Sequence, residues 1–563
     1  MLSPPHVWPR GATRWRPFLR LVSGRALCGG LLALLITASR MPAQTTAYVP
    51  LGDPAYEDLD ALERAGLVRD LLVGERPYSR AAFARFALEA SGRRAGSAPL
   101  SPRLQEALAR LAARFGTLPK ATAALTRTVG SVVLADAPAR AMRANAVTRG
   151  IDAELALLRQ RNYGRVIPTG VSLAIEQGLT LERPRLALEA SGRAYGGVAS
   201  GREANGGGSD GPTVDAQLLT ASLRTVVGPL AIDVGRTPLL TGFGAHGGAL
   251  LTDNARPADQ LRVRFDRPLR LPGPLAALGR WQGTVSLATM GRNRDQPGSI
   301  FSVIRISGRP VTPLEIGFTY LNQQGGAGAP PANVHDRLYD LFLFFLSGGS
   351  LEKSDKVAGL DVRLSVPAVR GALYANFATT DDRGRFRQPA GGYWEDAIWV
   401  AGIEHHGLGP EGRLDLRLEG RHTGPNPHTH HQYTSGVTLD RRVIGDALGP
   451  DGEGLSLGVD WNGTHHRTRL TLAMERYRSD SANAMPIPGR GPWDWDWYRL
   501  TKGPDERRQR IMLDRRSPRG WRGRETTVML GYERAIRFDF RDRPRHSAIM
   551  RVELRGGGRR IGR

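Results

Sequence analysis

The sequence predicts a mainly β protein: a transmembrane antiparallel β-barrel of about 18 strands that follows a small N-terminal helical bundle. An export signal begins the chain, short amphipathic segments follow it, and from about residue 121 apolar and polar residues alternate. We therefore expect a secretory signal peptide over residues 1–43, a helical bundle over 44–120 and the barrel over 121–563.

Residues 1–43 have the features of a secretory signal peptide. The first 25 residues carry five arginines and no acidic residue, and the apolar run "ALCGGLLALLITA" follows them. This run is too short to span a membrane, and it ends near small residues that suit cleavage after Ala43 or Gln44. The only cysteine, Cys28, lies inside the signal. The exported chain therefore has no disulfide and no thiolate metal site.

The exported chain remains strongly basic. Residues 1–43 contain six arginines and no acidic residue, so their removal lowers the formal charge from +24 to +18. Such a charge favours anionic partners, for example acidic polysaccharide or the phosphates of lipopolysaccharide. Dispersed arginines are equally consistent with a general preference for this residue at the surface. No nucleic-acid-binding module is recognisable.

Three segments after the signal have helical periodicity and helix-boundary residues. The first has Asp53 before Pro54, and the others have serine caps and a terminal glycine. The predicted helices span residues 53–68, 79–92 (Ser79 to Gly92) and 101–116 (Ser101 to Gly116). They indicate a small helical bundle.

The remainder of the chain has the period of two residues that is typical of strands. In "AGLDVRLSV", Leu360, Val362 and Leu364 point to one face, whereas Asp361 and Arg363 point to the other. A propeller would require a repeat of about 40–50 residues, which the sequence lacks. Charges on one face suit a wet lumen, and apolar residues on the other suit lipid.

Two short matches to catalytic or cofactor motifs do not have the structural context that those motifs require. "GFGAHG" (242–247) matches a dinucleotide fingerprint, but no helix follows it, so we expect a flexible barrel turn or loop. "GLSLG" (454–458) matches a nucleophile elbow, but Ser456 continues an alternating strand. We predict no catalytic residue and no cofactor.

The segment "RHTGPNPHTHHQY" (421–433) contains four histidines. Clustered imidazoles bind transition metals, whereas prolines and polar residues favour a solvated loop. We favour the solvated loop and predict no metal site. The histidines are His422, His428, His430 and His431.

Several long segments, in order, resemble the capsule assembly Wzi family. They include "AYVPLGDPAYEDLDALERAGLV" from residue 47, "GRTPLLTGFGAHGGALLTDNARPADQLRV" (235–263), "DKVAGLDVRLSVPAVRGALYANFATTDD" and "RRVIGDALGPDGEGLSLGVDW". The resemblance covers nearly the whole exported chain. It implies a non-catalytic, lectin-like barrel of the bacterial outer membrane, with a periplasmic bundle, that anchors capsular or exopolysaccharide.

The expected partners are therefore surface polysaccharide, outer-membrane lipid and lipopolysaccharide, with a monomeric barrel and no nucleic acid. An outer-membrane diffusion channel is the alternative, because about 18 strands can enclose water. A barrel-embedded hydrolase is a third hypothesis, for which Ser456 is the only nucleophile in a literal motif.

The segment "PWDWDWYRL" (492–500) is the first candidate for contact with glycan. Its alternating aromatic and acidic residues suit sugar stacking, but aromatic residues also form the interface girdles of barrels. Three polar residues near the glycine-rich loop either cap turns or touch glycan. The candidates are Trp493, Asp494, Trp495, Asp496, Trp497 and Tyr498, together with Asp253, Asn254 and Asp259.

Overall fold

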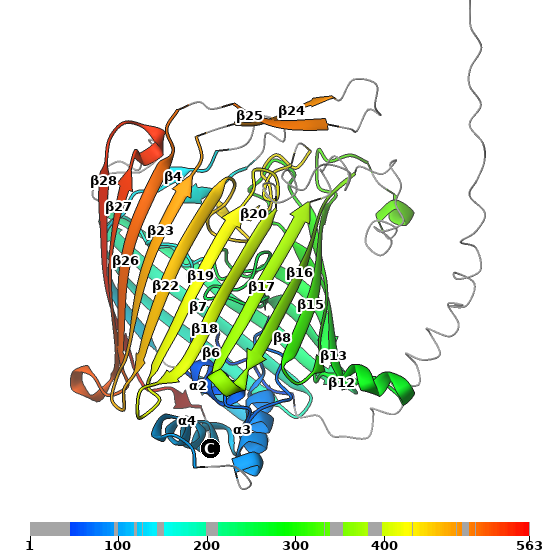
Figure 1. Ribbon diagram of the computed structural model, residues 1–563, viewed down its shortest axis with the longest axis vertical. Coiled ribbons are helices and arrows are strands. Elements are labelled where there is room, and N and C mark those ends of the chain that lie inside the picture. Colours follow the sequence, from blue (N-terminus) through cyan, green and yellow to red (C-terminus); the bar gives the residue numbers. More distant parts are fainter. Residues whose placement is uncertain are drawn as a thin grey trace, which may run out of the picture.

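The computed structural model describes residues 45–94, 99–117, 121–126, 128–143, 151–198, 212–331, 333–337, 353–380, 397–430, 432–479, 481–486, 495–500 and 503–561. The predicted signal peptide, residues 1–43, lies outside these ranges. A barrel of tilted strands dominates the fold, and three helices lie at one end of it (Figure 1). We call this end the helical end and the opposite end the loop end.

Eighteen antiparallel strands close the barrel, so the predicted fold class is confirmed. Three of the eighteen are interrupted and carry two labels each. In chain order they are β2 (Thr122–Leu125) with β3 (Val129–Asp136), β6 (Gly170–Arg183), β7 (Leu186–Val198), β8 (Pro212–Val227), β9 (Leu230–Arg236), β11 (Asp259–Phe265) with β12 (Leu269–Arg270), β13 (Arg280–Thr289), β14 (Ile300–Val311), β15 (Leu314–Gln324), β16 (Ser354–Val366), β17 (Gly371–Thr380), β18 (Ile398–Leu408), β19 (Leu414–Thr423), β22 (Gly452–Asn462), β23 (Arg467–Tyr477), β26 (Glu506–Ser517), β27 (Glu525–Ile536) and β28 (Arg545–Arg555) with β29 (Arg559–Arg560).

The last long strand closes the barrel against the first. β28 pairs with β3, from Ala548 opposite Asp136 to Arg555 opposite Val129. The barrel is therefore closed by a long strand that a basic segment follows. Every wall strand then has a hydrogen-bonded partner strand on both sides. This pairing satisfies the backbone N–H and C=O groups, which lipid hydrocarbon cannot do.

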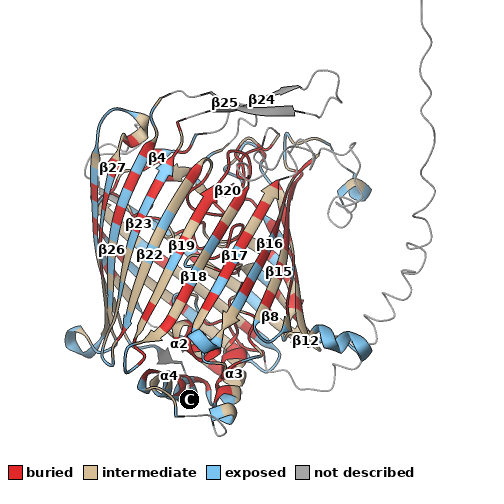
Figure 2. Cartoon of the chain, viewed as in Figure 1, coloured by how far each residue is buried: buried red, intermediate tan, exposed pale blue. Residues whose placement is uncertain are grey.

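The alternation of residue type along each strand separates a polar lumen from an apolar outer face. Leu360 of β16 is 62% exposed on the outside, whereas its neighbour Asp361 is 7% exposed inside. The alternating bands of exposure along the strands are visible in Figure 2. Exposed Trp461 and Trp521 mark the helical end, and Tyr532 marks the loop end. Aromatic residues in these positions are typical of the two membrane interfaces of a barrel.

The helices form a small bundle with its own apolar core. They are α2 (Ala55–Arg64), α3 (Arg80–Arg94) and α4 (Pro102–Phe115). The rings of Phe83 and Phe115 stack at 4.9 Å in this core. Asp53 and Ser79 accept hydrogen bonds from the first turns of α2 and α3 as predicted, but Gly92 lies inside α3 rather than at its end. In the described ranges, no helix is long and apolar enough to cross a membrane.

The connections at the two ends of the barrel differ in length. At the helical end, residues 184–185, 228–229 and 312–313 form two-residue turns. At the loop end, long segments fold back into the barrel; we call them the lumen loops. They are residues 137–143 with 151–169, residues 237–258, and residues 424–430 with 432–451. They carry the short pairs β4 (Arg140–Ala141) with β5 (Glu154–Leu155) and β20 (Thr438–Leu439) with β21 (Arg442–Val443).

The lumen loops give the barrel an internal core. Leu250 and Ile444 of two loops pack with Phe301 and Val303 of β14. One lumen loop also joins the N-terminal region, because β10 (Leu240–Thr241) pairs with β1 (Glu75–Arg76). Helices, loops and wall are thus connected inside the barrel.

Candidate functional site: the charged cavity between the helices and the lumen loops

A polar cavity of about 480 Å³ lies inside the barrel, between α2, the glycine-rich lumen loop and the wall. Its lining contains eleven arginines and ten carboxylates, so opposite charges nearly balance. A balanced lining does not concentrate anions or cations as a single-sign cleft does. The acidic members are Asp53, Glu57, Asp60, Glu63, Asp253, Glu404, Asp415, Asp460, Asp514 and Glu553.

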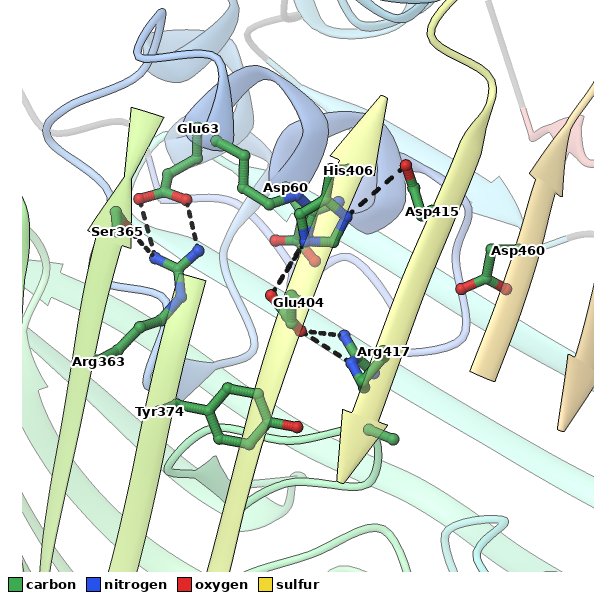
Figure 3. A network of polar contacts seen from close by, with 12 residues as sticks. Asp60, Glu63, Arg363, Ser365, Tyr374, Glu404, His406, Asp415, Arg417 and Asp460 are labelled. Carbon is green, nitrogen blue, oxygen red and sulfur yellow. Dashed lines mark hydrogen bonds and ion pairs between the residues drawn. The ribbon is translucent and has the colours of Figure 1, made fainter. Parts of the chain in front are cut away.

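Glu63 of α2 joins the bundle to the wall. Its carboxylate accepts hydrogen bonds from Arg363 of β16 at 3.1 and 3.2 Å (Figure 3). It also accepts one from Arg309 of β14 at 2.8 Å. Burial opposes ionisation of Glu63, but the charges of Arg363 and Arg309 outweigh it and hold the pKa of this carboxyl below its ordinary value. The three charged groups are nearly inaccessible to solvent, so each depends on the others.

Glu315 of β15 fixes the chain that follows α2. It accepts the backbone N–H groups of Val73 and Gly74 at 2.9 and 2.7 Å, and it also bonds Arg309 at 3.1 Å. A buried carboxylate that accepts several N–H groups is well satisfied. Glu315 and Glu63 therefore share Arg309 and couple the bundle to two adjacent strands.

A second cluster links α4 to strands β18 and β19. Arg103 donates to both oxygens of Asp415, the longer contact being 2.7 Å, and Arg417 donates to Glu404 at 2.8 Å. His406 lies between the two carboxylates, 3.2 Å from Glu404 and 3.7 Å from Asp415 (Figure 3). Carboxylates held by guanidinium groups are weak bases. The cluster is therefore suited to holding elements together rather than to proton transfer.

A third set of contacts completes the attachment of the bundle. Arg467 of β23 bonds Glu57 and Asp58 of α2, and Arg413 donates to Glu106 of α4 at 2.8 Å. Together the three sets bind α2 and α4 to strands on several sides of the helical end. The bundle is fixed by buried and partly buried ion pairs, not only by the covalent connection to β2.

The "GFGAHG" segment is a rigid support for wall side chains. Phe243 donates its N–H to Asn376 and accepts from the same amide, both at 2.8 Å, while Ala245 donates to Glu419 at 3.0 Å. Gly244 has φ +129°, and a Cβ there would lie 2.7 Å from a Glu419 oxygen. The expectation of a loop is confirmed, but the expected flexibility is wrong, because buried wall groups hold this loop on both sides.

The three predicted polar residues near this loop have internal partners. Asp253 lines the cavity and lies 2.9 Å from His246 Nδ1, while Asn254 is fully buried and donates to Val443 O at 2.8 Å. Asp259, on the wall, forms a two-bond ion pair with Arg236 at 2.9 Å. Asp253 and Asn254 lie next to each other, whereas Asp259 lies on β11.

The histidine-rich segment is buried inside the barrel, so the predicted solvated loop is wrong. His428 is 2% exposed, and burial lowers the pKa of its imidazole to about 4. His422 instead lies on β19, where its ring stacks on Trp399 at 5.5 Å. His431 lies outside the described residues, and within the described ones no group of His, Cys, Asp and Glu is arranged to hold a metal ion.

The tryptophan-rich segment lies apart from the cavity. β24 (Ser481–Pro486) and β25 (Trp495–Leu500) form a separate hairpin beyond the loop end of the wall (Figure 1). Trp495 pairs with Pro486 and Trp497 with Ala484 along its backbone, and Asp496 and Tyr498 lie on the same strand. Because β25 is not a wall strand, a membrane girdle does not explain its position. Trp493 and Asp494 lie outside the described residues.

The residues that connect the bundle, Glu63, Glu315, Glu404 and Asp415, were not singled out from the sequence. The three on strands, Glu315, Glu404 and Asp415, had one signal, a charged residue in an alternating segment, whereas Glu63 lies on helix α2. Ser456 lies on β22 as predicted, and its hydroxyl is 3.5 Å from Glu419 O.

Comparisons with known proteins agree on a barrel. The sequence model of a family described as capsule assembly protein Wzi matches residues 142–546. No curated protein sequence matches the chain. A solved structure of Wzi from Escherichia coli, described as an outer-membrane protein involved in group 1 capsule assembly and as a carbohydrate-binding β-barrel, is 17% identical with a TM-score of 0.62. The match covers 91% of this chain and 99% of that one, and it establishes the fold.

Two other solved barrels are more distant. The outer membrane protein OprD of Pseudomonas aeruginosa is 8% identical with a TM-score of 0.40, over 78% of this chain and 94% of that one. OccAB1 of Acinetobacter baumannii is 10% identical with a TM-score of 0.39, over 79% and 98%.

Proposed function

The chain belongs to the capsule assembly protein Wzi family, and we propose that it is an outer-membrane barrel that anchors or organises capsular or exopolysaccharide at the cell surface. The family match over residues 142–546 carries this proposal. The charge of the exported chain supports it where the polymer is acidic. The anchor acts by binding, with no chemical step on the polymer.

Residues 1–43 are a signal peptide, residues 44–120 a periplasmic bundle and residues 121–563 the membrane barrel in this proposal. The orientation follows from the connections, because outer-membrane barrels have short periplasmic turns and longer extracellular loops. The helical end then faces the periplasm and the loop end faces the outside. A single closed barrel is complete as a monomer, since every wall strand is paired.

The glycan surface belongs at the loop end. The β24–β25 hairpin extends beyond the wall there, and aromatic rings beside carboxylates provide both stacking and hydrogen bonding for sugars. We therefore assign glycan contact first to Trp493, Trp495, Trp497 and Tyr498, with Asp494 and Asp496. The internal bonds of Asp253 and Asn254 make these two supports of the loops, and Asp259 is held by Arg236 on the wall, so none of the three is the first contact.

The test is the division of polysaccharide between cells and medium in wild type and a clean deletion, with total synthesis quantified. We expect the deletion to shed polymer into the medium while synthesis is unchanged, and the wild-type gene to restore retention. Complete retention by the deletion strain would reject the anchor. A parallel fall in total polymer would instead indicate a role in synthesis or export.

A diffusion channel is the second candidate, and a closed barrel of eighteen strands is large enough for it. Three lumen loops occupy the interior, and buried ion pairs hold the bundle at the helical end. Conductance of the reconstituted full-length protein distinguishes the two functions. A steady open conductance favours the channel, whereas a silent barrel favours the anchor.

A further inference from the structure

Four consecutive wall strands carry a basic residue at the same level of the outer face, near the loop end. They are Arg476 of β23, Arg507 of β26, Arg534 of β27 and His546 of β28, and all four are exposed. Arg476 is directly opposite Arg507, and Arg534 is directly opposite His546. Gln509 lies opposite Arg534, which makes Arg507 and Arg534 diagonal neighbours across β26 and β27. We call these four residues the basic row.

Cross-strand repulsion makes the basic row unfavourable by itself. Directly opposed like charges destabilise a sheet. Arg476 is neutralised by Asp505 at 2.6 Å and Glu453 at 3.1 Å, and His546 contacts the Tyr532 hydroxyl at 2.6 Å. Arg507 and Arg534, in contrast, have no ion-pair partner among the residues that the structure describes. Two guanidinium groups thus remain available on the outer face.

The outer face near the loop end of other strands is different. Arg236 of β9 faces Asp259 of β11 and is paired with it. Val171 of β6 faces Val198 of β7. At these two places the outer face carries a paired arginine or apolar residues, in contrast to the wall from β26 to β27.

An apolar surface lies directly below the basic row, toward the middle of the membrane. It consists of exposed side chains on the same strands, with the Tyr532 ring between them and the charges. Its members are Leu472, Met474, Ile511, Leu513, Leu530 and Met550. Anionic groups above and acyl chains below would match this surface.

We propose that the basic row binds the phosphorylated headgroup of lipopolysaccharide in the outer leaflet, with Arg507 and Arg534 as the phosphate ligands and the apolar surface below them against the acyl chains. Planar guanidinium groups form paired hydrogen bonds with phosphate oxygens. Phosphate binding also removes the repulsion between neighbouring cations. The site rests on the outer-membrane location and orientation proposed above, but not on binding of polysaccharide.

The test measures binding of purified rough lipopolysaccharide to the refolded mature protein by native mass spectrometry. The variant is Arg507→Gln with Arg534→Gln, and the control is Arg515→Gln. Arg515 is an exposed residue of the same strand β26, but it lies toward the helical end. Folding of each protein is checked by its heat-dependent mobility on an unboiled gel.

We expect the double variant to bind lipopolysaccharide about 30-fold more weakly, since each arginine near an anionic surface contributes about one kcal/mol. The control should stay within about twofold of wild type on the same scale. Wild type should lose the same factor when the lipid is enzymatically dephosphorylated. Equal binding by the double variant, or an equal loss in the control, overturns the proposal.

Thermal stability gives a second readout that does not depend on the affinity measurement. In detergent without lipopolysaccharide, the double variant should melt at or above the wild-type temperature, because repulsion is reduced. With lipopolysaccharide, wild type should gain more stability than the variant.

A competition experiment separates lipid from glycan. Displacement of the lipid by lipid-free capsular polymer would overturn the assignment, because the basic row would then be a glycan site. Retention of polysaccharide by cells tests the anchor separately.

Discussion

Glu63 of α2 and Arg363 of β16 are 300 positions apart in the sequence and form two hydrogen bonds of 3.1 and 3.2 Å inside the helical end. Arg309 of β14 completes the contact at 2.8 Å. This carboxylate is the common partner of two buried guanidinium groups. Glu63 is therefore one of the main side chains that fix the bundle in the barrel.

Glu63→Gln should loosen the bundle while the barrel stays closed. The change removes a charged partner of buried Arg363 and one of the two carboxylates bonded to Arg309, and breaking a buried pair costs about 3–5 kcal/mol. Amide hydrogen exchange in α2 and α4 should rise strongly, whereas exchange in the wall strands should not. Arg93→Gln in the last turn of α3 is the control, because its ion pair with Glu89 is partly exposed and lies within one helix. Unchanged protection of α2 would contradict the role assigned to Glu63.

Acidification should also loosen the bundle, and neutralisation should reverse the change. The pKa values of Glu57 and Glu63 are lowered: burial opposes the shift, and the charges of Arg467 and of Arg363 with Arg309 outweigh it. The pKa of each carboxyl is lower in the folded protein than its ordinary value of 4.5 in the unfolded chain, so each stabilises the fold fully above that pH. This contribution is lost as the pH falls through the lowered pKa of the folded protein. Exchange in α2 should increase below about pH 4.5 and recover on neutralisation. A flat profile between pH 7 and pH 3 would count against these ion pairs.

Gly244→Ala should release the glycine-rich lumen loop. The added Cβ meets the Glu419 carboxylate at 2.7 Å, and φ +129° is unfavourable for a side chain. Exchange at Phe243 and Ala245 should rise, and brief conductance events should become more frequent than in wild type. Gly130→Ala is the matched control, because a Cβ there has open space. Identical conductance in both variants would show that this loop does not limit passage.

His428 should stay neutral well below the pH at which a free imidazole is protonated. Burial lowers its pKa from 6.5 to about 4, so the unfolded chain takes up the proton first. Its contribution to stability is therefore complete above pH 6.5 and decreases as the pH falls toward about 4. Histidine C2 hydrogen exchange followed by mass spectrometry reports this pKa directly, with the denatured protein as reference. A native value near 6.5 would mean that the lumen loop is solvated.

Trp495→Ala combined with Trp497→Ala should reduce polysaccharide retention without unfolding the barrel. Loss of stacking costs on the order of 1 kcal/mol for each ring, which a repeated polymer contact multiplies across the cell surface. The variant should release polymer into the medium at wild-type expression, whereas Trp521→Ala at the helical end should not. Normal retention of polysaccharide by the double variant would show that the glycan contact lies outside the β24–β25 hairpin.

The sequence by itself determined the class of fold. Alternation such as that of residues 358–366 specifies which side faces lipid, because the side-chain period of a strand is two and a shift of one residue would expose charges to hydrocarbon. Local signals likewise predicted the three helices, with Asp53 and Ser79 as caps. The family resemblance followed from segments that keep the same order along the chain, and the family match bears it out.

Only the tertiary structure decided how the lumen is filled and how the bundle is held. Glu63 and Arg363, or Ala245 and Glu419, are far apart along the chain and carry no local pattern that pairs them. Closing the barrel brings them together, because each lumen position faces several others across the interior. The histidine-rich segment shows the same limit: its composition indicates a solvated loop, yet the surrounding wall and loops bury it, and burial alone changes the chemistry of His428.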